Sequence, residues 1–132
     1  MPQQTNYAAD AGRIAALQLD IRSGTLSAVA LVERCLARIE AVDPMVQAWR
    51  HAARDSALRE AELLDREARA GRFRGPLHGI PVGIKDIIDV AGMTTLANSK
   101  TRAGSPPATA DADIVAALRL AGAVILGKTH TT

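Results

Sequence analysis

One lysine inside an apolar segment constrains this chain more than any other feature. The segment covers residues 75–89, GPLHGIPVGIKDIID, and it surrounds Lys85 with aliphatic side chains, glycines and prolines. Val82 and Ile84 alternate with a glycine and with Lys85, which predicts a short strand with the apolar pair on one face and the lysine on the other. Whether that second face meets water or a closed site decides if Lys85 has a chemical role.

Two interpretations of Lys85 follow from the residues alone. The simpler one is a lysine at a strand edge that points into water, because lysines are rarely buried. The alternative is a desolvated amine, since Gly79, Pro81 and Gly83 let neighbouring backbone come close. A desolvated lysine loses its charge more readily, and its neutral amine can accept the proton of a hydroxyl nucleophile.

Composition excludes several function classes. The 132 residues carry a net charge of +2, and the hydrophobic share of 48% with 23% charged residues is typical of a soluble globular protein. The charges are spread along the chain and aromatic residues make up only 2%, so neither the basic stripe nor the stacking surface of a nucleic-acid-binding protein is present. No signal peptide or membrane-spanning run occurs. With a single cysteine, these features predict a cytoplasmic protein without a nucleic-acid or membrane partner.

The first part of the chain follows a helical pattern. Apolar residues recur at helical spacing over residues 10–22, and Gly24 can supply a left-handed cap. Ser27 is a suitable N-cap for a second helix, which the Asp43-Pro44 step is expected to stop. Cys35 lies beside the apolar stripe of that helix, and we interpret it as a small hydrophobic residue rather than a reactive thiol.

A weak strand and a third helix are predicted next. Residues 45–51 form the strand candidate, and the helix is predicted over residues 53–70. On this helix each of three acidic residues precedes a basic residue by four positions, and we expect the three pairs to form a solvated face. The pairs are Asp55 with Arg59, Glu62 with Arg66 and Asp65 with Arg69.

The second half of the chain has short apolar runs separated by glycine and proline. Residues 90–107 are predicted to be a loop. Thr109 or Asp111 is expected to cap a helix over residues 112–121, and a buried strand over residues 123–126 follows. The order strand, helix, strand predicts a crossover that joins a parallel pair, and therefore an α/β sheet.

Residues 122–129 match the spelling of a phosphate-binding loop, G-x-x-x-x-G-K-S/T. Such a loop leaves a strand, wraps its amides around phosphates and enters a helix. Here a helix is predicted before Gly122, and the four intervening residues, Ala-Val-Ile-Leu, belong in a strand. We therefore interpret Gly122 as a helix end and Gly127 as a strand exit, and nucleotide binding is the less favoured alternative.

Two segments, GPLHGIPVGIKDIIDVAGMTT and DADIVAALRLAGAVILGKTHTT, resemble the amidase signature family. The resemblance extends from about Ser27 to the last residue. It implies a fold of N-terminal helices followed by the first strands and crossover helix of a mixed sheet layered between helices. It also implies that Lys85 is the catalytic lysine of a serine, cis-serine, lysine triad that cleaves amides through an acyl-enzyme. By the same comparison Lys128 and Thr129 are framework residues, and no metal or organic cofactor is implied.

Two positions depart from the commonest pattern of the family, and a third position matches it. Asn98 stands where the family usually has glycine, and asparagine tolerates left-handed backbone well. His130 stands where asparagine is frequent, and we interpret it as a tolerated variant rather than a metal ligand. His78 matches the family, and its expected role is hydrogen bonding within its loop, because no second histidine is spaced to share a metal with it.

The family's two serines are missing from these residues. No Ser-Gly-Gly stretch occurs, and neither Ser99 nor Ser105 has the glycine-rich setting of an oxyanion hole. We therefore predict that residues 1–132 are the N-terminal part of a single amidase domain, mainly helical over 1–70 and strand, loop, helix, strand over 71–132. Such a fragment is expected to be inactive alone, with both serines beyond Thr132.

The predicted reaction is hydrolysis of a small-molecule amide, with a homodimer as one partner prediction. A glutamine-dependent amidotransferase A subunit, which assembles with partner subunits, is the alternative within the same family. A non-catalytic interaction module is the alternative of another class, in which Lys85 has no chemical role.

Overall fold

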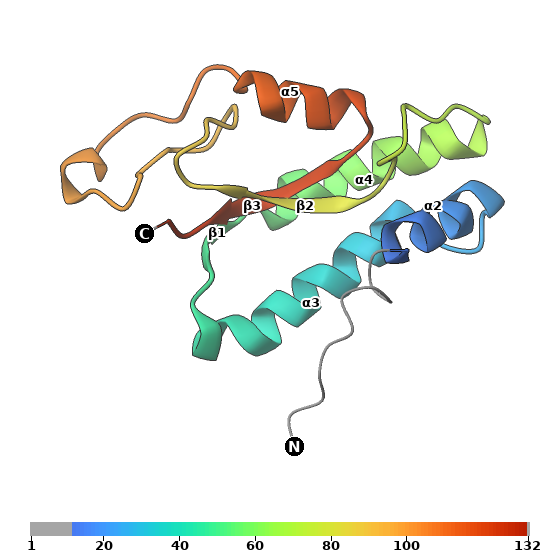
Figure 1. Ribbon diagram of the computed structural model, residues 1–132, viewed down its shortest axis with the longest axis horizontal. Helices are drawn as coiled ribbons and strands as arrows, with labels where there is room; N and C mark the ends of the chain where they lie inside the picture. Colours follow the sequence, from blue (N-terminus) through green and yellow to red (C-terminus); the bar gives the residue numbers. More distant parts are fainter. Residues whose placement is uncertain (1–11, 132) are drawn as a thin grey trace.

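The computed structural model describes residues 12–131 as a three-stranded mixed sheet with helices on both of its faces (Figure 1). The strand order is β1-β3-β2, and β3 runs antiparallel to β1 and parallel to β2. The elements in chain order are α2 (Arg13–Ser23), α3 (Ala28–Val46), β1 (Trp49–Ala52), α4 (Arg54–Arg69), β2 (Pro81–Lys85), the short 3-10 helix η1 (Lys100–Arg102), α5 (Asp113–Leu120) and β3 (Val124–Thr129). The predicted α/β architecture and the predicted parallel pair are both confirmed.

Two apolar clusters hold the helices to the sheet. Val124 and Leu126 of β3 pack against α3 and α4 on one face. Ile125, between them, points to the other face and joins Ile84 of β2 and Val115 of α5. Val124, Ile125 and Leu126 thus alternate between the two faces, which explains why the predicted apolar run is buried on both sides of the sheet. No helix within residues 12–131 is both long and apolar enough to cross a membrane.

The caps of α2 and α3 follow the sequence, whereas the end of α3 does not. Gly24 has φ 79° after α2, and Ser27 accepts a hydrogen bond from the backbone of Ala30 at 3.0 Å. The prediction that Asp43-Pro44 stops the helix is wrong, because α3 continues to Val46. Proline removes one hydrogen-bond donor, and in the last turn the helix still closes through the N–H of Gln47, which donates to the Asp43 carbonyl at 2.7 Å. Residues 10 and 11 of the predicted first helix lie outside the described residues.

The strand predicted over residues 45–51 begins later than expected. Met45 and Val46 belong to α3 and are exposed. Trp49 starts β1, and the Asp43 carboxylate accepts a hydrogen bond from its N–H at 3.1 Å. Cys35 is half-buried beside the apolar cluster of α3, and burial raises the pKa of its thiol, as expected for an unreactive packing residue.

One of the charges expected on the solvated face of α4 is buried. Asp65 has 9% of its surface exposed, and its carboxylate accepts hydrogen bonds from the N–H groups of Ala28 at 2.7 Å and Val29 at 3.1 Å. These are N–H groups of the first turn of α3, which have no partner within their own helix. Asp65 therefore fastens α4 to the start of α3, and the prediction that it forms a surface pair is wrong.

The crossover helix forms, but its predicted side-chain cap does not. Ala112 occupies the N-cap position of α5, so neither Thr109 nor Asp111 caps it. Asp111 instead accepts hydrogen bonds from the backbone of Ala91 and from Arg119, both at 2.8 Å. Its carboxylate therefore binds an arginine near the end of α5 and a loop amide 20 positions earlier in the chain.

Candidate active site

Lys85 is the last residue of β2, at the carboxyl end of the parallel pair. Ile84 is buried whereas Gly83 and Lys85 are exposed, so the predicted alternation of faces is confirmed. Within residues 12–131 the Lys85 side chain makes no ion pair and no side-chain hydrogen bond. Its amine is therefore accessible at an edge of the sheet where ligands of α/β proteins commonly bind.

Trp49 explains why a glycine precedes Ile84 on this strand. A Cβ atom on Gly83 would lie 2.7 Å from Cη2 of Trp49 and 3.1 Å from Cγ2 of Thr129. Thr129 is also the residue whose Cα pairs with that of Lys85 across the ladder. The indole thus packs over the backbone of β2, on the same face of the sheet from which Lys85 projects.

Asp86, the next residue, is fixed by several contacts at once. Its side chain has 1% of its surface exposed and accepts a hydrogen bond from Nζ of Lys128 at 2.9 Å. Its other carboxylate oxygen lies 2.6 Å from Nε of Arg50, an ion pair without the alignment of a hydrogen bond, and accepts from the N–H of Leu96 at 3.3 Å. Strands β1 and β3 and the loop after β2 therefore converge on one carboxylate.

A β-bulge places Lys128 where it can reach Asp86. Val82 is opposite Ile125, but Gly83 is opposite Gly127, so β3 has one extra residue, Leu126. In a strand without a bulge, Lys128 would be on the same face as Leu126, two positions before it, and would point toward α3 and α4. With the bulge, Lys128 points to the α5 face, where it is fully buried and also donates to Oγ1 of Thr95 at 3.1 Å.

The charges around Asp86 set its protonation. Burial acts to raise the pKa of the Asp86 carboxyl, but the hydrogen bond from Lys128 and the positive charges of Lys128 and Arg50 outweigh it and hold the pKa below its ordinary value. Asp86 is therefore ionised at neutral pH, and the ion pair with Lys128 persists there.

The same contacts exclude a phosphate-binding role for residues 122–129. Ala123 to Leu126 are buried and β3 occupies the place of the loop, with α5 before it. The ammonium of Lys128 is directed into the protein and bound to Asp86. The interpretation of Lys128 as a framework residue agrees with this geometry.

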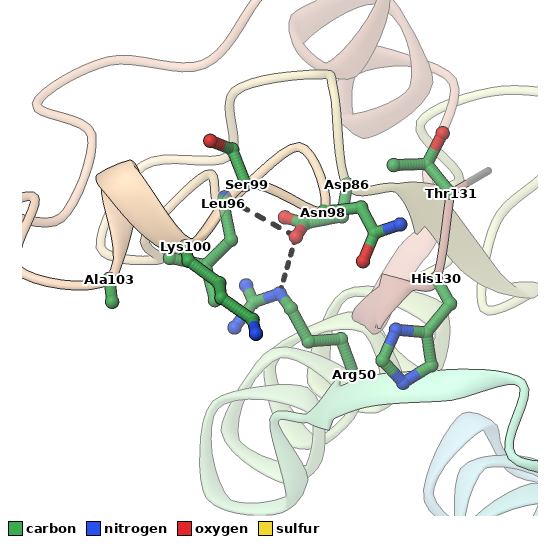
Figure 2. A pocket seen from close by; sticks show the side chains of 9 residues that line it. All are labelled: Arg50, Asp86, Leu96, Asn98, Ser99, Lys100, Ala103, His130 and Thr131. Carbon is green, nitrogen blue, oxygen red and sulfur yellow. Dashed lines mark hydrogen bonds and ion pairs between the residues drawn. The ribbon is translucent and has the colours of Figure 1, made fainter.

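A pocket of about 320 Å³ opens beside Asp86, at the carboxyl ends of β2 and β3 (Figure 2). Asp86 and Arg50 form one side of it, joined by their ion pair. The residues that line it are Arg50, Asp86, Leu96, Asn98, Ser99, Lys100, Ala103, His130 and Thr131. Lys85 is not among them. The predicted catalytic lysine therefore does not line this pocket, although the next residue, Asp86, does.

Three residues singled out in the sequence have defined surroundings. Asn98 has φ 54°, the left-handed conformation expected where the family has glycine. His130 is exposed at the rim of the pocket. His78 is fully buried, with Nδ1 accepting from the N–H of Arg74 and Nε2 facing the Leu64 carbonyl, both at 3.0 Å. A carbonyl can only accept, so His78 carries its proton on Nε2 and has the predicted loop-bonding role.

No group of three histidine, cysteine, aspartate or glutamate side chains within residues 12–131 could hold a metal ion. Sequence reasoning did not anticipate the charged cluster around Asp86. The available signal was a lysine two positions after a buried apolar run in β3, because a charged residue there requires a partner of opposite charge.

Comparison with known proteins connects most of the described region to one family. The family profile described as Amidase matches residues 30–132. The chain is 42% identical over 115 residues to the A subunit of a glutamyl-tRNA(Gln) amidotransferase from Chloroflexus aurantiacus, covering 87% of this chain and 23% of that protein. It is 40% identical over 111 residues to an amidase of Pseudomonas putida, covering 84% and 23%.

A solved structure gives the same result. The native peptide amidase from Stenotrophomonas maltophilia superposes with a TM-score of 0.81 and 46% identity, covering 88% of this chain and 24% of that one. The chain therefore spans about a quarter of the length of the relatives it matches.

Proposed function

Because this chain belongs to the amidase signature family, we propose that it is part of an enzyme that hydrolyses amide bonds and that Lys85 is its proton acceptor. The observation that supports this role is the different use of two lysines at the same edge of the sheet. Lys128 is buried and bound to Asp86, whereas Lys85 is exposed and unpaired within residues 12–131. Of these two lysines, Lys85 is the one whose amine can reach a reacting group.

In the proposed mechanism, Lys85 takes the proton of the nucleophilic serine through a bridging cis-serine while that serine attacks the amide carbonyl. The C–N bond then breaks, the amine leaves with that proton, and water hydrolyses the resulting acyl-enzyme. Backbone amides hold the oxyanion. Both serines come from outside these 132 residues, because no Ser-Gly-Gly stretch occurs within them. Residues 1–132 are then the N-terminal part of one amidase domain, and by themselves they do not turn over substrate. Continuing the reading frame past Thr132 should reveal paired serines in a glycine-rich run.

Substitution of Lys85 tests the proposal directly. In the enzyme that contains this chain, Lys85→Ala should fold normally but form no acyl-enzyme with an activated amide, as measured by mass spectrometry of the intact protein. Lys85→Arg should fail as well, because arginine keeps the positive charge but does not give up its proton. Arg59→Ala, which removes an exposed charge from α4, is the matched control. Normal acylation by Lys85→Ala would remove Lys85 from the mechanism.

An amidotransferase A subunit is the second candidate, favoured by the identity to the Chloroflexus aurantiacus protein. The substrate would be glutamine, and the released ammonia would pass to an acceptor bound by partner subunits. Glutamine hydrolysis that rises when such subunits are added favours this candidate over a free-standing amidase, for which a homodimer is the partner prediction. A non-catalytic interaction module would show no acylation even with Lys85 intact.

A further inference from the structure

We infer that Asp86 is a positioning residue for Lys85: its buried carboxylate, held by Lys128 and Arg50, fixes the end of β2 from which the Lys85 side chain projects. This inference rests on the proposed role of Lys85. It assigns a function to Lys128 as well, which would otherwise be a buried charge at a strand end without a reason.

Asp86 is bound through its backbone as well as its side chain. Its N–H donates to the Thr129 carbonyl at 3.0 Å, and its carbonyl accepts from the N–H of Ala97 at 2.9 Å. The Lys85 carbonyl also accepts a hydrogen bond, from the N–H of Ile88 at 3.0 Å. The backbone that follows the Lys85 Cα atom is therefore held at successive peptide groups, whereas no side-chain hydrogen bond or ion pair within residues 12–131 holds the Lys85 amine.

The charged cluster has no surplus charge to offer a ligand. Lys128 joins Asp86 to Thr95, whose hydroxyl donates to Asp89 at 2.7 Å, and Arg50 completes the set. Two carboxylates and two cations therefore balance one another. Each of the four charged groups binds another member of the cluster. Arg50 also donates a hydrogen bond to the backbone carbonyl of Thr94. Asp86 and Lys128 are buried, Arg50 is half-buried and Asp89 is exposed. Charges that bind one another within the protein in this way are suited to fixing a geometry rather than to binding an ion.

The cluster joins segments that are far apart in the chain. Arg50 comes from β1, Lys128 from β3 and Thr95 from the loop that follows β2. Arg50 and Lys128 contact the Asp86 carboxylate directly, as Figure 2 shows for Arg50, and Thr95 holds the Lys128 amine. A proton acceptor must be held close to its target, and a misplacement of about 1 Å can reduce a rate by about 100-fold.

The test compares Asp86→Asn with Asp65→Asn in the complete enzyme. Both substitutions remove the charge of a buried carboxylate that accepts backbone N–H bonds, but Asp65 contacts α3 rather than β2. For Asp86→Asn we expect faster hydrogen exchange of the amides at residues 84–88, an acylation rate lower by about 100-fold and an unchanged KM. Asp65→Asn should leave the acylation rate and the exchange at residues 84–88 unchanged.

A second variant distinguishes loss of positioning from failure to fold. Asp86→Asn combined with Lys128→Met removes both buried charges, so no unpaired charge remains between them. This double variant should fold and still lose acylation to the same extent. Acylation at the wild-type rate in either variant, or unchanged exchange at residues 84–88, would overturn the inference. If Lys85→Ala acylates normally, the proposed function itself has failed. If Lys85→Ala is inactive while Asp86→Asn is fully active, only the positioning role is wrong.

Discussion

Replacement of Lys128 by methionine measures how much the buried ion pair with Asp86 contributes to the free energy of unfolding. Methionine has a similar volume and no charge, so the substitution leaves no cavity, and its main effect is to remove one partner of Asp86. Breaking a buried pair by removing one partner costs about 3 to 5 kcal/mol, because the remaining charge stays buried. Asp86 keeps its contacts with Arg50 and with the N–H of Leu96, so we expect the lower end, about 3 kcal/mol.

Urea unfolding followed by far-UV circular dichroism measures this change. With a urea dependence of about 1 to 3 kcal/mol per molar, a loss of about 3 kcal/mol lowers the unfolding midpoint by about 1 to 3 M. Adding Asp86→Asn to Lys128→Met should recover part of the loss, with a coupling energy of about 2 kcal/mol in the double-mutant cycle. A loss below about 1 kcal/mol for Lys128→Met would mean that this pair contributes no more than an exposed salt bridge, which would refute the reasoning.

Two further predictions concern a glycine and the pH dependence. Gly122→Ala should cost more than about 3 kcal/mol of unfolding free energy, because its Cβ would lie 2.5 Å from Cα of His78 at φ +95°. Gly92→Ala has a similar φ of +81° but no atom within 4 Å, so it should cost only about 1 kcal/mol in the same urea titration. Equal losses would show that backbone conformation, not the contact with His78, makes Gly122 necessary. The pKa of Asp86 is lower in the folded state, so the folded state binds fewer protons than the unfolded state. The stability that the ionised Asp86 contributes is therefore fully present above its ordinary pKa and is lost as the pH falls through its folded-state pKa. The difference in unfolding free energy between wild type and Asp86→Asn should therefore shrink from about pH 6 to about pH 3, and a constant difference would contradict the assignment.

Local patterns predicted most of the elements correctly. Gly24 and Ser27 act within one turn of a helix: Gly24 adopts the left-handed conformation because it has no side chain, and the Ser27 hydroxyl binds a nearby N–H group. The alternation of Val82 and Ile84 with Lys85 likewise depends only on the period of a strand. The family resemblance drawn from the two quoted segments is confirmed by the match over residues 30–132.

The errors arose where a distant partner competes with a local one. Asp65 has the spacing of a helix surface pair, but the unpaired N–H groups of α3 bind its carboxylate more strongly than an exposed arginine would. Asp111 has a capping position, but Ala91 and Arg119 bind it instead. The N–H groups of α3 and of Ala91 come near these carboxylates only when the chain folds, whereas Arg119 lies on α5, eight positions after Asp111.

The sequence by itself determined that Lys85 ends a strand with its side chain on the face opposite Ile84, because side chains alternate along any strand. It did not determine which of the two lysines at this edge would be buried. The tertiary structure decided that through the extra residue in β3, which turns Lys128 toward Asp86 and leaves Lys85 accessible. The physical reason is that the register between two strands depends on the pairing of segments far apart in the chain, whereas the face of a residue within one strand depends only on its neighbours.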